Sequence, residues 1–253
     1  MPLRWLYLKP MTGIGPFWIE PSDKRVQFPD VSLALKEPNG LLAVGGSLTP
    51  RRLLTAYMQG IFPWYSQGQP ILWWSPDPRA VLFPANVKVS RSMRKEIRAG
   101  RFQITVDRAF REVIEACAEA RPNSHGTWIT PEIIEAYCHL HGIGLAHSVE
   151  AWHDGKLVGG LYGVALGKVY FGESMFSRMT NASKVAFIYL VHQLAAWDFA
   201  VIDCQIQSDH LRSLGSEDIR RTEFISILQR SCTLPHERTP WSMDADAIAS
   251  LYR

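Results

Sequence analysis

The sequence predicts an α+β (α/β) protein with two parts: a small irregular N-terminal domain over residues 1–79, and a larger domain over residues 80–253 that has a central, mostly antiparallel sheet flanked by helices. Three observations predict this. Residues 1–79 are rich in proline and glycine, which favour turns and short strands. Residues 146–176 hold a run of strand-like segments separated by tight-turn sequences. Helical periodicity appears before and after that run.

In the N-terminal domain, Thr49-Pro50 is a helix-start signal because proline suits the first helical position, and it predicts a helix over 51–60. The next segment, Gly60–Pro84, contains three tryptophans among five prolines. Proline lacks the N–H that a helix interior needs, so we expect loop and short strand here. Its large aromatic side chains therefore either fill a core or form a surface on which a flat group can stack.

The larger domain is expected to alternate helices and strands, with hairpin turns at Asp154-Gly155 and Gly167 inside the strand run. The elements expected in order are a short strand and a helix within 87–100, a strand over 102–106, a helix over 107–120, a helix from Pro131 with Thr130 as its N-cap, the strands of 146–176, a helix over 182–197, a strand over 201–205 and a helix over 219–230.

Composition excludes several classes of protein. A hydrophobic fraction of 47% and a charged fraction of 20% are ordinary for a globular chain. Four cysteines without a C-x-x-C pair, and eight histidines without H-E-x-x-H, argue against a metal site and suit reduced thiols in a cytoplasmic protein. The N-terminus lacks the apolar run of a secretory signal. Polar residues interrupt the apolar stretch Val185–Ile202, so we read it as a buried helix and strand, without a membrane span.

The clearest charge pattern follows Ser90, where four basic residues at i, i+3, i+4 and i+7 share one helix face. They are Arg91, Arg94, Lys95 and Arg98. Like charges on one face repel, and a polyanion would offset that repulsion by releasing counterions. With a net charge of only +3, any nucleic-acid contact must come from such local clustering. The alternative is a solvated helix face.

Two acidic positions stand out. Glu173 follows an apolar strand among methionines and a phenylalanine, so it is either a satisfied core carboxylate or the cation-binding element of a pocket. Asp203 and Gln205 are two apart on a predicted strand and share a face, with Cys204 turned away. Such an acid–amide pair can orient an attacking amine, or can simply be the polar face of an edge strand. The motifs G-x-S-x-G, Walker A and G-x-G-x-x-G are absent, which removes hydrolase, P-loop and Rossmann readings.

Several segments together resemble the leucyl/phenylalanyl-tRNA–protein transferase family. They are EPNGLLAVGGSLTP, GIFPWYSQGQPILWWSPDPRAVLFP, HGTWIT, YGVALGKVYFGESMFSRMTNASK and IDCQ. The resemblance runs from about Phe28 to about Arg230. It implies a bacterial, cytoplasmic enzyme that moves leucine or phenylalanine, and methionine less well, from charged tRNA to a protein beginning with arginine or lysine. The product is marked for N-degron degradation. The implied fold pairs a small N-terminal domain with a domain similar to GNAT acyltransferases.

The resemblance also implies roles for individual residues. Trp64 would stack on the terminal adenosine of the tRNA, with Trp128 near the same 3′ end, and Glu173 would sit beside the cationic first residue of the acceptor. Asp203 and Gln205 match the proposed catalytic relay for the attacking amine. The aminoacyl pocket would be lined by Tyr170, Met175, Phe187, Leu190, Leu194 and Ile202. By its spacing alone, the helical stripe Phe187, Leu190, Val191 and Leu194 is either ordinary core packing or a pocket wall. The basic helix, Arg91, Arg94, Lys95 and Arg98, would meet acceptor-stem phosphates. No cofactor or metal is implied, and a monomer is expected.

This sequence departs from the best-known pattern at the pocket, where leucines occupy positions 190 and 194 and Leu161 stands in place of methionine. The preference between leucine and phenylalanine is therefore left open. Two other classes of function remain as alternatives: a coenzyme A–dependent GNAT acyltransferase and a non-catalytic tRNA-binding module. The short A-L-G-K turn lacks the longer glycine-rich loop that coenzyme A binding needs, which favours a tRNA donor.

Overall fold

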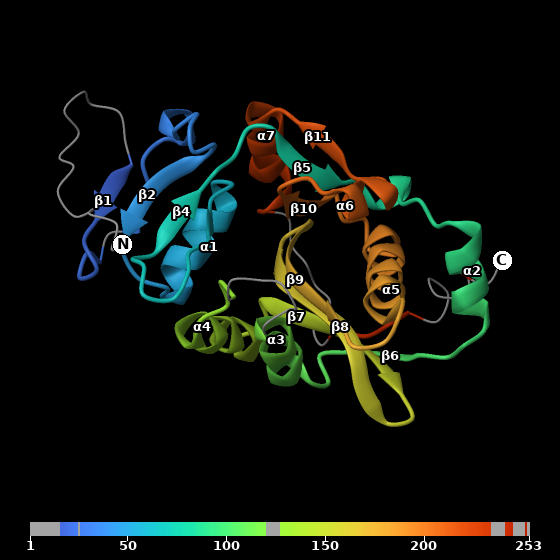
Figure 1. Cartoon of the computed structure of the whole chain (residues 1–253). Coiled ribbons are helices and arrows are strands. Elements are labelled where there is room, and N and C mark those ends of the chain that lie inside the picture. Colours follow the sequence, from blue (N-terminus) through green and yellow to red (C-terminus); the bar gives the residue numbers. More distant parts are fainter. Residues whose placement is uncertain (1–15, 25, 120–126, 234–240, 245–250, 252–253) are drawn as a thin grey trace.

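The computed structural model describes residues 16–24, 26–119, 127–233, 241–244 and 251. They form two sheets that lie side by side, with helices packed around the larger one (Figure 1). The chain passes from the first sheet to the second between Trp74 and Arg79, next to the expected domain boundary at residue 80. Residues 1–15, which the expected N-terminal domain includes, lie outside the described residues, and the division into two domains stays a prediction.

The first sheet has four short strands in the order β1-β2-β4-β3. Their bounds are β1 Phe17–Ile19, β2 Leu41–Gly45, β3 Phe62–Pro63 and β4 Leu72–Trp74. The helix expected over 51–60 is α1, Pro50–Met58, preceded by the short 3-10 turn η1, Val31–Leu33. The prediction of loop and short strand for Gly60–Pro84 is confirmed, because β3, β4 and the next strand are two to four residues long.

The second sheet has seven strands in the order β11-β5-β10-β9-β8-β7-β6. Their bounds are β5 Arg79–Leu82, β6 Gln103–Val106, β7 Ala146–His153, β8 Lys156–Leu166, β9 Val169–Ser177, β10 Val201–Gln205 and β11 Glu217–Ile219. Every neighbouring pair is antiparallel except β9 and β10, which run parallel. The α+β class with a mostly antiparallel central sheet is confirmed.

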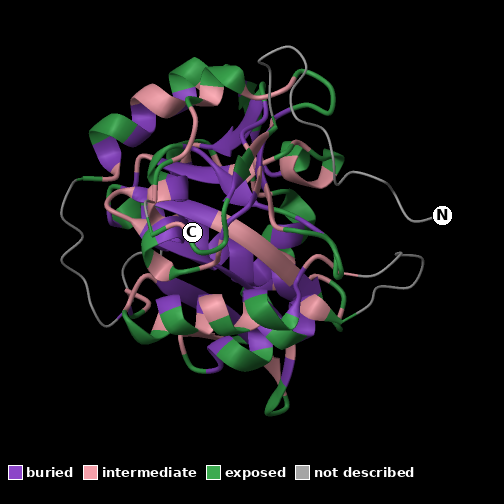
Figure 2. Cartoon of the chain, turned by 90° about the vertical axis from the view of Figure 1, so that its left-hand side faces the viewer, coloured by how far each residue is buried: buried purple, intermediate pink, exposed green. Residues whose placement is uncertain are grey.

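Helices cover both faces of this sheet (Figure 1). Their bounds are α2 Arg91–Arg98, α3 Phe110–Ala118, α4 Pro131–Gly142, α5 Ala182–Ala196, α6 Asp209–Ser213 and α7 Arg221–Ser231, and the 3-10 turn η2 spans Pro84–Asn86. Strand β8 shows why two cores form: Leu161 packs with α5 on one face and Tyr162 with α3 on the other. Successive strand residues point to opposite faces, so a sheet covered on both sides is largely apolar on both faces. Figure 2 shows these strands buried between exposed helix surfaces.

Local expectations failed where tertiary contacts decide the structure. The strand expected within 87–90 is irregular chain. The helix expected from Asp107 begins at Phe110, because Asp107 has a left-handed backbone (φ 55°) and its carboxylate accepts the Ser148 N–H at 2.9 Å. The final residue of that expected helix, Ala120, lies outside the described residues. The last helix begins at Arg221 because residues 217–219 pair with β5 instead. Within the described part of the chain, no helix combines the length and apolarity that a membrane crossing requires.

Candidate functional site

Two cavities meet beside the middle of β9 and the carboxyl end of β10. The first has a volume of about 250 Å³ and lies between β8, β9, β10, α5 and α6. The second, of about 150 Å³, lies beside β3 and the segment before α4. Glu173, Cys204 and Gln205 line both cavities, so these three residues mark the junction between them.

Backbone irregularities in two neighbouring strands produce this junction. Along β9, Ser174 pairs with Tyr162 and Gly172 with Gly163, which leaves Glu173 as an extra residue. Along β10, Asp203 and Gln205 pair with successive residues of β5, which leaves Cys204 as the extra one. A β-bulge of this kind bends the strand and redirects a side chain. The expectation that Cys204 faces away from the site is therefore wrong, since strict alternation is broken at that residue.

Glu173 is held between two tyrosine hydroxyls. Tyr57 of α1 donates to Oε1 at 2.7 Å and Tyr137 of α4 donates to Oε2 at 3.1 Å, and the two hydroxyls also bond to each other. Burial raises the pKa of Glu173 from 4.5 to about 7, although both tyrosine hydrogen bonds lower it. This carboxyl group therefore changes charge near neutral pH, and it offers a binding group for a cation at the junction.

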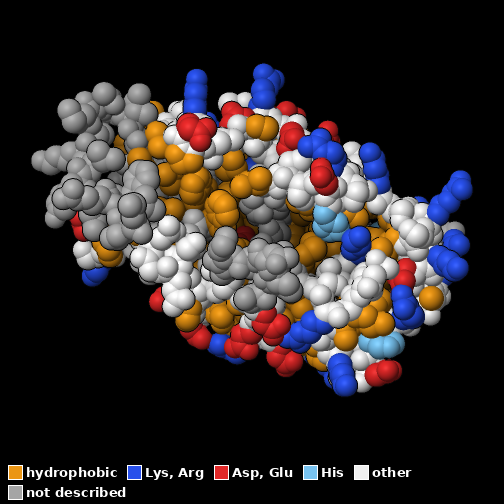
Figure 3. Space-filling view, in the orientation of Figure 1, with side chains coloured by type: hydrophobic (Ala, Val, Ile, Leu, Met, Phe, Trp, Pro, Cys, Tyr) orange, Lys and Arg blue, Asp and Glu red, His pale blue; other side chains and the backbone are white. Residues whose placement is uncertain are grey.

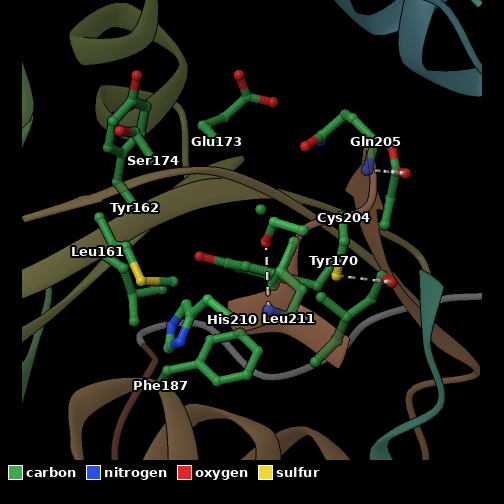
Figure 4. A pocket seen from close by; sticks show the side chains of 15 residues that line it. Leu161, Tyr162, Tyr170, Glu173, Ser174, Phe187, Cys204, Gln205, His210 and Leu211 are labelled. Carbon is green, nitrogen blue, oxygen red and sulfur yellow. Dashed lines mark hydrogen bonds between the residues drawn. The ribbon is translucent and has the colours of Figure 1, made fainter. Parts of the chain in front are cut away.

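Asp203 is fully buried and paired with Arg79. The guanidinium Nε donates to Oδ1 and Nη2 donates to Oδ2, each at 2.7 Å. Oδ1 also accepts the backbone N–H of Gln205 at 3.0 Å, drawn as a dashed line in Figure 4. Gln205 has a left-handed backbone (φ 58°), and its buried Nε2 has no hydrogen-bond partner in the described structure. An amide NH₂ group without a partner at a cavity wall can donate to an acceptor of a ligand.

The first cavity has a carboxyl and an amide at one end and mainly apolar side chains at the other. Figure 4 shows Glu173 and Gln205 at one end, and Leu161, Phe187 and the imidazole of His210 at the other. Of the residues expected to bind the aminoacyl side chain, four line this cavity: Tyr170, Met175, Phe187 and Ile202. An apolar cavity that opens onto a cation-binding carboxyl and an unpartnered amide suits a molecule with an apolar group next to a reacting polar one.

Leu190 and Leu194 line neither cavity. Both are buried in the core around α5, at 1% and 0% exposure, about one and two helical turns beyond Phe187, so the cavity reaches only the first part of this helix face. Sequence reasoning missed the wall formed by α6, which contributes Ser208, His210 and Leu211. The sequence feature that could have predicted α6 is Ser208, an N-cap residue whose hydroxyl accepts the Leu211 N–H at 3.2 Å.

Aromatic side chains line the second cavity. Trp64 and Trp128 both lie there, together with Phe62 and Ile206. Trp64 is 44% exposed and packs edge-on against Trp74, whose indole N–H donates to the Trp64 carbonyl at 2.7 Å. An exposed indole held by a second indole is a rigid stacking surface.

The basic residues of α2 are exposed, whereas Met93 and Ile97 of the same helix pack into the core beside α5. Figure 3 shows lysine and arginine side chains gathered at the end of the molecule where α2 lies. The helix-face prediction for Arg91, Arg94, Lys95 and Arg98 is thus matched by their placement on one exposed surface.

Burial raises the pKa of the Cys204 thiol far above its usual range, which disfavours the nucleophilic thiolate.

Comparisons with known proteins agree on one family. The family model described as leucyl/phenylalanyl-tRNA protein transferase matches residues 81–229, and the model for the N-terminal domain of that transferase matches residues 46–77. A protein named leucyl/phenylalanyl-tRNA–protein transferase from Nitrosospira multiformis is 57% identical, over 87% of this chain and 95% of its own. Another of that name from Azoarcus sp. is 59% identical, over 81% and 88%.

Solved structures give a more distant likeness. A GCN5-related N-acetyltransferase from Kribbella flavida aligns with 67% of this chain and 60% of its own, at 13% identity and a TM-score of 0.34.

Proposed function

Because this chain belongs to the leucyl/phenylalanyl-tRNA–protein transferase family, and is an aminoacyltransferase, we propose that its two adjoining cavities hold the aminoacyl end of a charged tRNA. The observation that carries the proposal is the junction at Glu173 and Gln205. There an apolar cavity, an aromatic cavity and a cation-binding carboxyl meet. The apolar cavity takes the leucine or phenylalanine side chain, and the aromatic cavity takes the terminal adenosine.

The aromatic cavity suits a nucleobase because Trp64 and Trp128 present indole faces, and stacking of a base on an aromatic side chain contributes about 1–3 kcal/mol. With the base there and the side chain near Met175 and Phe187, the ester carbonyl lies at the junction. The exposed basic face of α2 supplies contacts to backbone phosphates.

The reaction requires little chemistry from the protein, because an aminoacyl ester is already activated. The α-nitrogen of the acceptor forms a bond to the carbonyl carbon, the ester C–O bond breaks, and the nitrogen's proton ends on the ribose oxygen that leaves. Gln205 orients the attacking amine as a hydrogen-bond acceptor. Holding two reactants in this way can supply about 7–11 kcal/mol of barrier reduction.

The finer identity of the acceptor follows from Glu173. When ionised, it attracts a positively charged side chain, and we expect proteins that begin with arginine or lysine to be modified and thereby marked for N-degron degradation. Aminoacyl-tRNA is found in the cytoplasm, so we expect the enzyme to act there. We also expect it to act as a monomer. Asp203 and Gln205 are the residues that we assign to the transfer step.

The test is transfer of labelled leucine from leucyl-tRNA to a peptide beginning with arginine, compared with one beginning with alanine. We expect transfer to the arginine peptide alone. Folded enzyme that modifies neither peptide would contradict the proposal. Acetyl-coenzyme A serves as the competing donor: tight binding measured by calorimetry would favour the acyltransferase alternative. Full activity in Gln205→Ala and Asp203→Ala would remove these residues from the transfer step.

A further inference from the structure

We propose that Arg79 is a positioning residue for the transfer reaction: it locks Asp203 and the Gln205 backbone against the wall that carries Trp64. The proposal rests on the proposed function, and it assigns Asp203 a role as a fixed anchor, without proton transfer. The sequence patterns assigned no role to Arg79, which lies 124 positions before Asp203.

Arg79 is fully paired inside the protein. Its fork holds both oxygens of Asp203 at 2.7 Å, and Nη1 donates to the Gly60 carbonyl at 3.1 Å. Its guanidinium lies between the rings of Phe62 and Phe224, 4.8 and 4.7 Å from their centroids. Arg79 is 1% exposed and Asp203 is 0% exposed. Planar, bidentate and stacked contacts of this kind match arginine and no other cation.

In this arrangement both carboxylate oxygens of Asp203 are held by Arg79. Removing either partner alone would leave a buried charge without its counter-charge, which is strongly unfavourable. The remaining contact of Asp203 is the Gln205 N–H, which fixes the left-handed turn at Gln205. The pair therefore determines where the Gln205 amide lies at the cavity junction. Figure 4 labels Gln205 at that place.

The same side chain connects the two sheets. Gly60 and Phe62 belong to the segment that leads into β3 and Trp64, whereas Arg79 and Asp203 belong to β5 and β10 of the larger sheet. Arg79 thus sets the distance between the stacking wall and the amide that orients the acceptor. Displacing a reacting group by a fraction of its working distance lowers the rate far more than it weakens binding.

The experiment compares the full-length parent with Arg79→Lys, Arg79→Met and the pair Arg79→Met/Asp203→Asn. Steady-state kcat and KM are measured for leucyl-tRNA and for an arginine-initiated peptide, with thermal unfolding to confirm the fold. Arg111→Met is the matched control, because Arg111 is 50% exposed and pairs with Glu135 on the surface. We expect the control to keep the parental kcat.

Arg79→Lys keeps the charge and loses the fork, so we expect kcat to fall at least tenfold while KM for leucyl-tRNA changes less than threefold. A smaller fall in kcat would overturn the proposal.

In the double variant, the amide oxygen introduced by Asp203→Asn can still accept the Gln205 N–H, and no lone charge is buried. Its kcat should exceed that of Arg79→Met at least tenfold. A folded double variant no more active than Arg79→Met would show that the Asp203 charge takes part in the chemistry, which also overturns the proposal. A folded parent without transfer would instead refute the proposed function, while a loss of thermal stability in Arg79→Met that the double variant recovers would still show the Arg79–Asp203 pairing.

Discussion

Removal of the Trp64 indole tests the stacking surface. Trp64→Ala takes away the face that we assign to the terminal adenosine, and a stacked base contributes about 1–3 kcal/mol. Since about 1.4 kcal/mol corresponds to a factor of ten, KM for leucyl-tRNA should rise about 5- to 150-fold. Trp64 is 44% exposed, so the stability cost is about half that of a fully buried apolar side chain, about 1–2 kcal/mol.

The assay is steady-state transfer of leucine to an arginine-initiated peptide, with the peptide saturating and leucyl-tRNA varied. Trp18→Ala is the matched control, because Trp18 is 56% exposed and lies on β1, at the opposite edge of the first sheet from β3. Trp73→Ala is the contrasting variant: Trp73 is fully buried and its indole donates to the Gly45 carbonyl, so it should lose about 3–5 kcal/mol of stability. An unchanged KM in folded Trp64→Ala would refute the stacking assignment.

Three further predictions concern charge. Because the folded-state pKa of Glu173, about 7, lies above its ordinary value of 4.5, the folded protein binds the extra proton between these pH values. The free energy of unfolding should therefore fall as pH rises from about 4.5 to about 7. KM for the arginine peptide should fall as pH rises past 7, because the ionised carboxylate attracts the peptide's positive charge. A Glu173→Gln variant with the same two pH profiles would contradict this. Tyr57→Phe removes a hydrogen bond that lowers this pKa, so it should move the KM transition to higher pH, and an unmoved transition would count against the Tyr57 contact. Charge reversal at Arg94 and Lys95 should raise KM for leucyl-tRNA and reduce the salt slope by roughly 1.5–2. Lys156→Glu, at the exposed first residue of β8, is the control, and an unchanged slope in the double variant would remove α2 from the tRNA contact.

Much of the larger domain could be predicted because its signals are local. The β-rich run contains Asp154-Gly155 and Gly167, which specify tight turns, and α5 is long and apolar. The residue types at Glu173, Asp203 and Gln205 also predicted a polar site in apolar surroundings. These features depend on nearby residues alone, so local sequence patterns are enough to predict them.

The geometry of the site could not be predicted, because it depends on pairing between distant segments. Strict alternation placed Cys204 away from the site, whereas the β-bulge brings it to the junction. Leu190 and Leu194 have the residue type of a pocket wall, but the cavity ends before it reaches them along α5, and both lie in the core. The Arg79–Asp203 pair joins residues from separate sheet strands that no periodic pattern links.

The role of Gln205 is tested most directly by single-turnover transfer of leucine from pre-bound leucyl-tRNA to an arginine-initiated peptide, comparing the parent with Gln205→Asn. Asparagine tolerates the left-handed backbone at this position and only retracts the amide by one methylene. We expect a transfer rate at least tenfold lower with unchanged affinity for leucyl-tRNA, because the amide at the cavity junction orients the attacking amine. A parental rate in the folded variant would contradict this role.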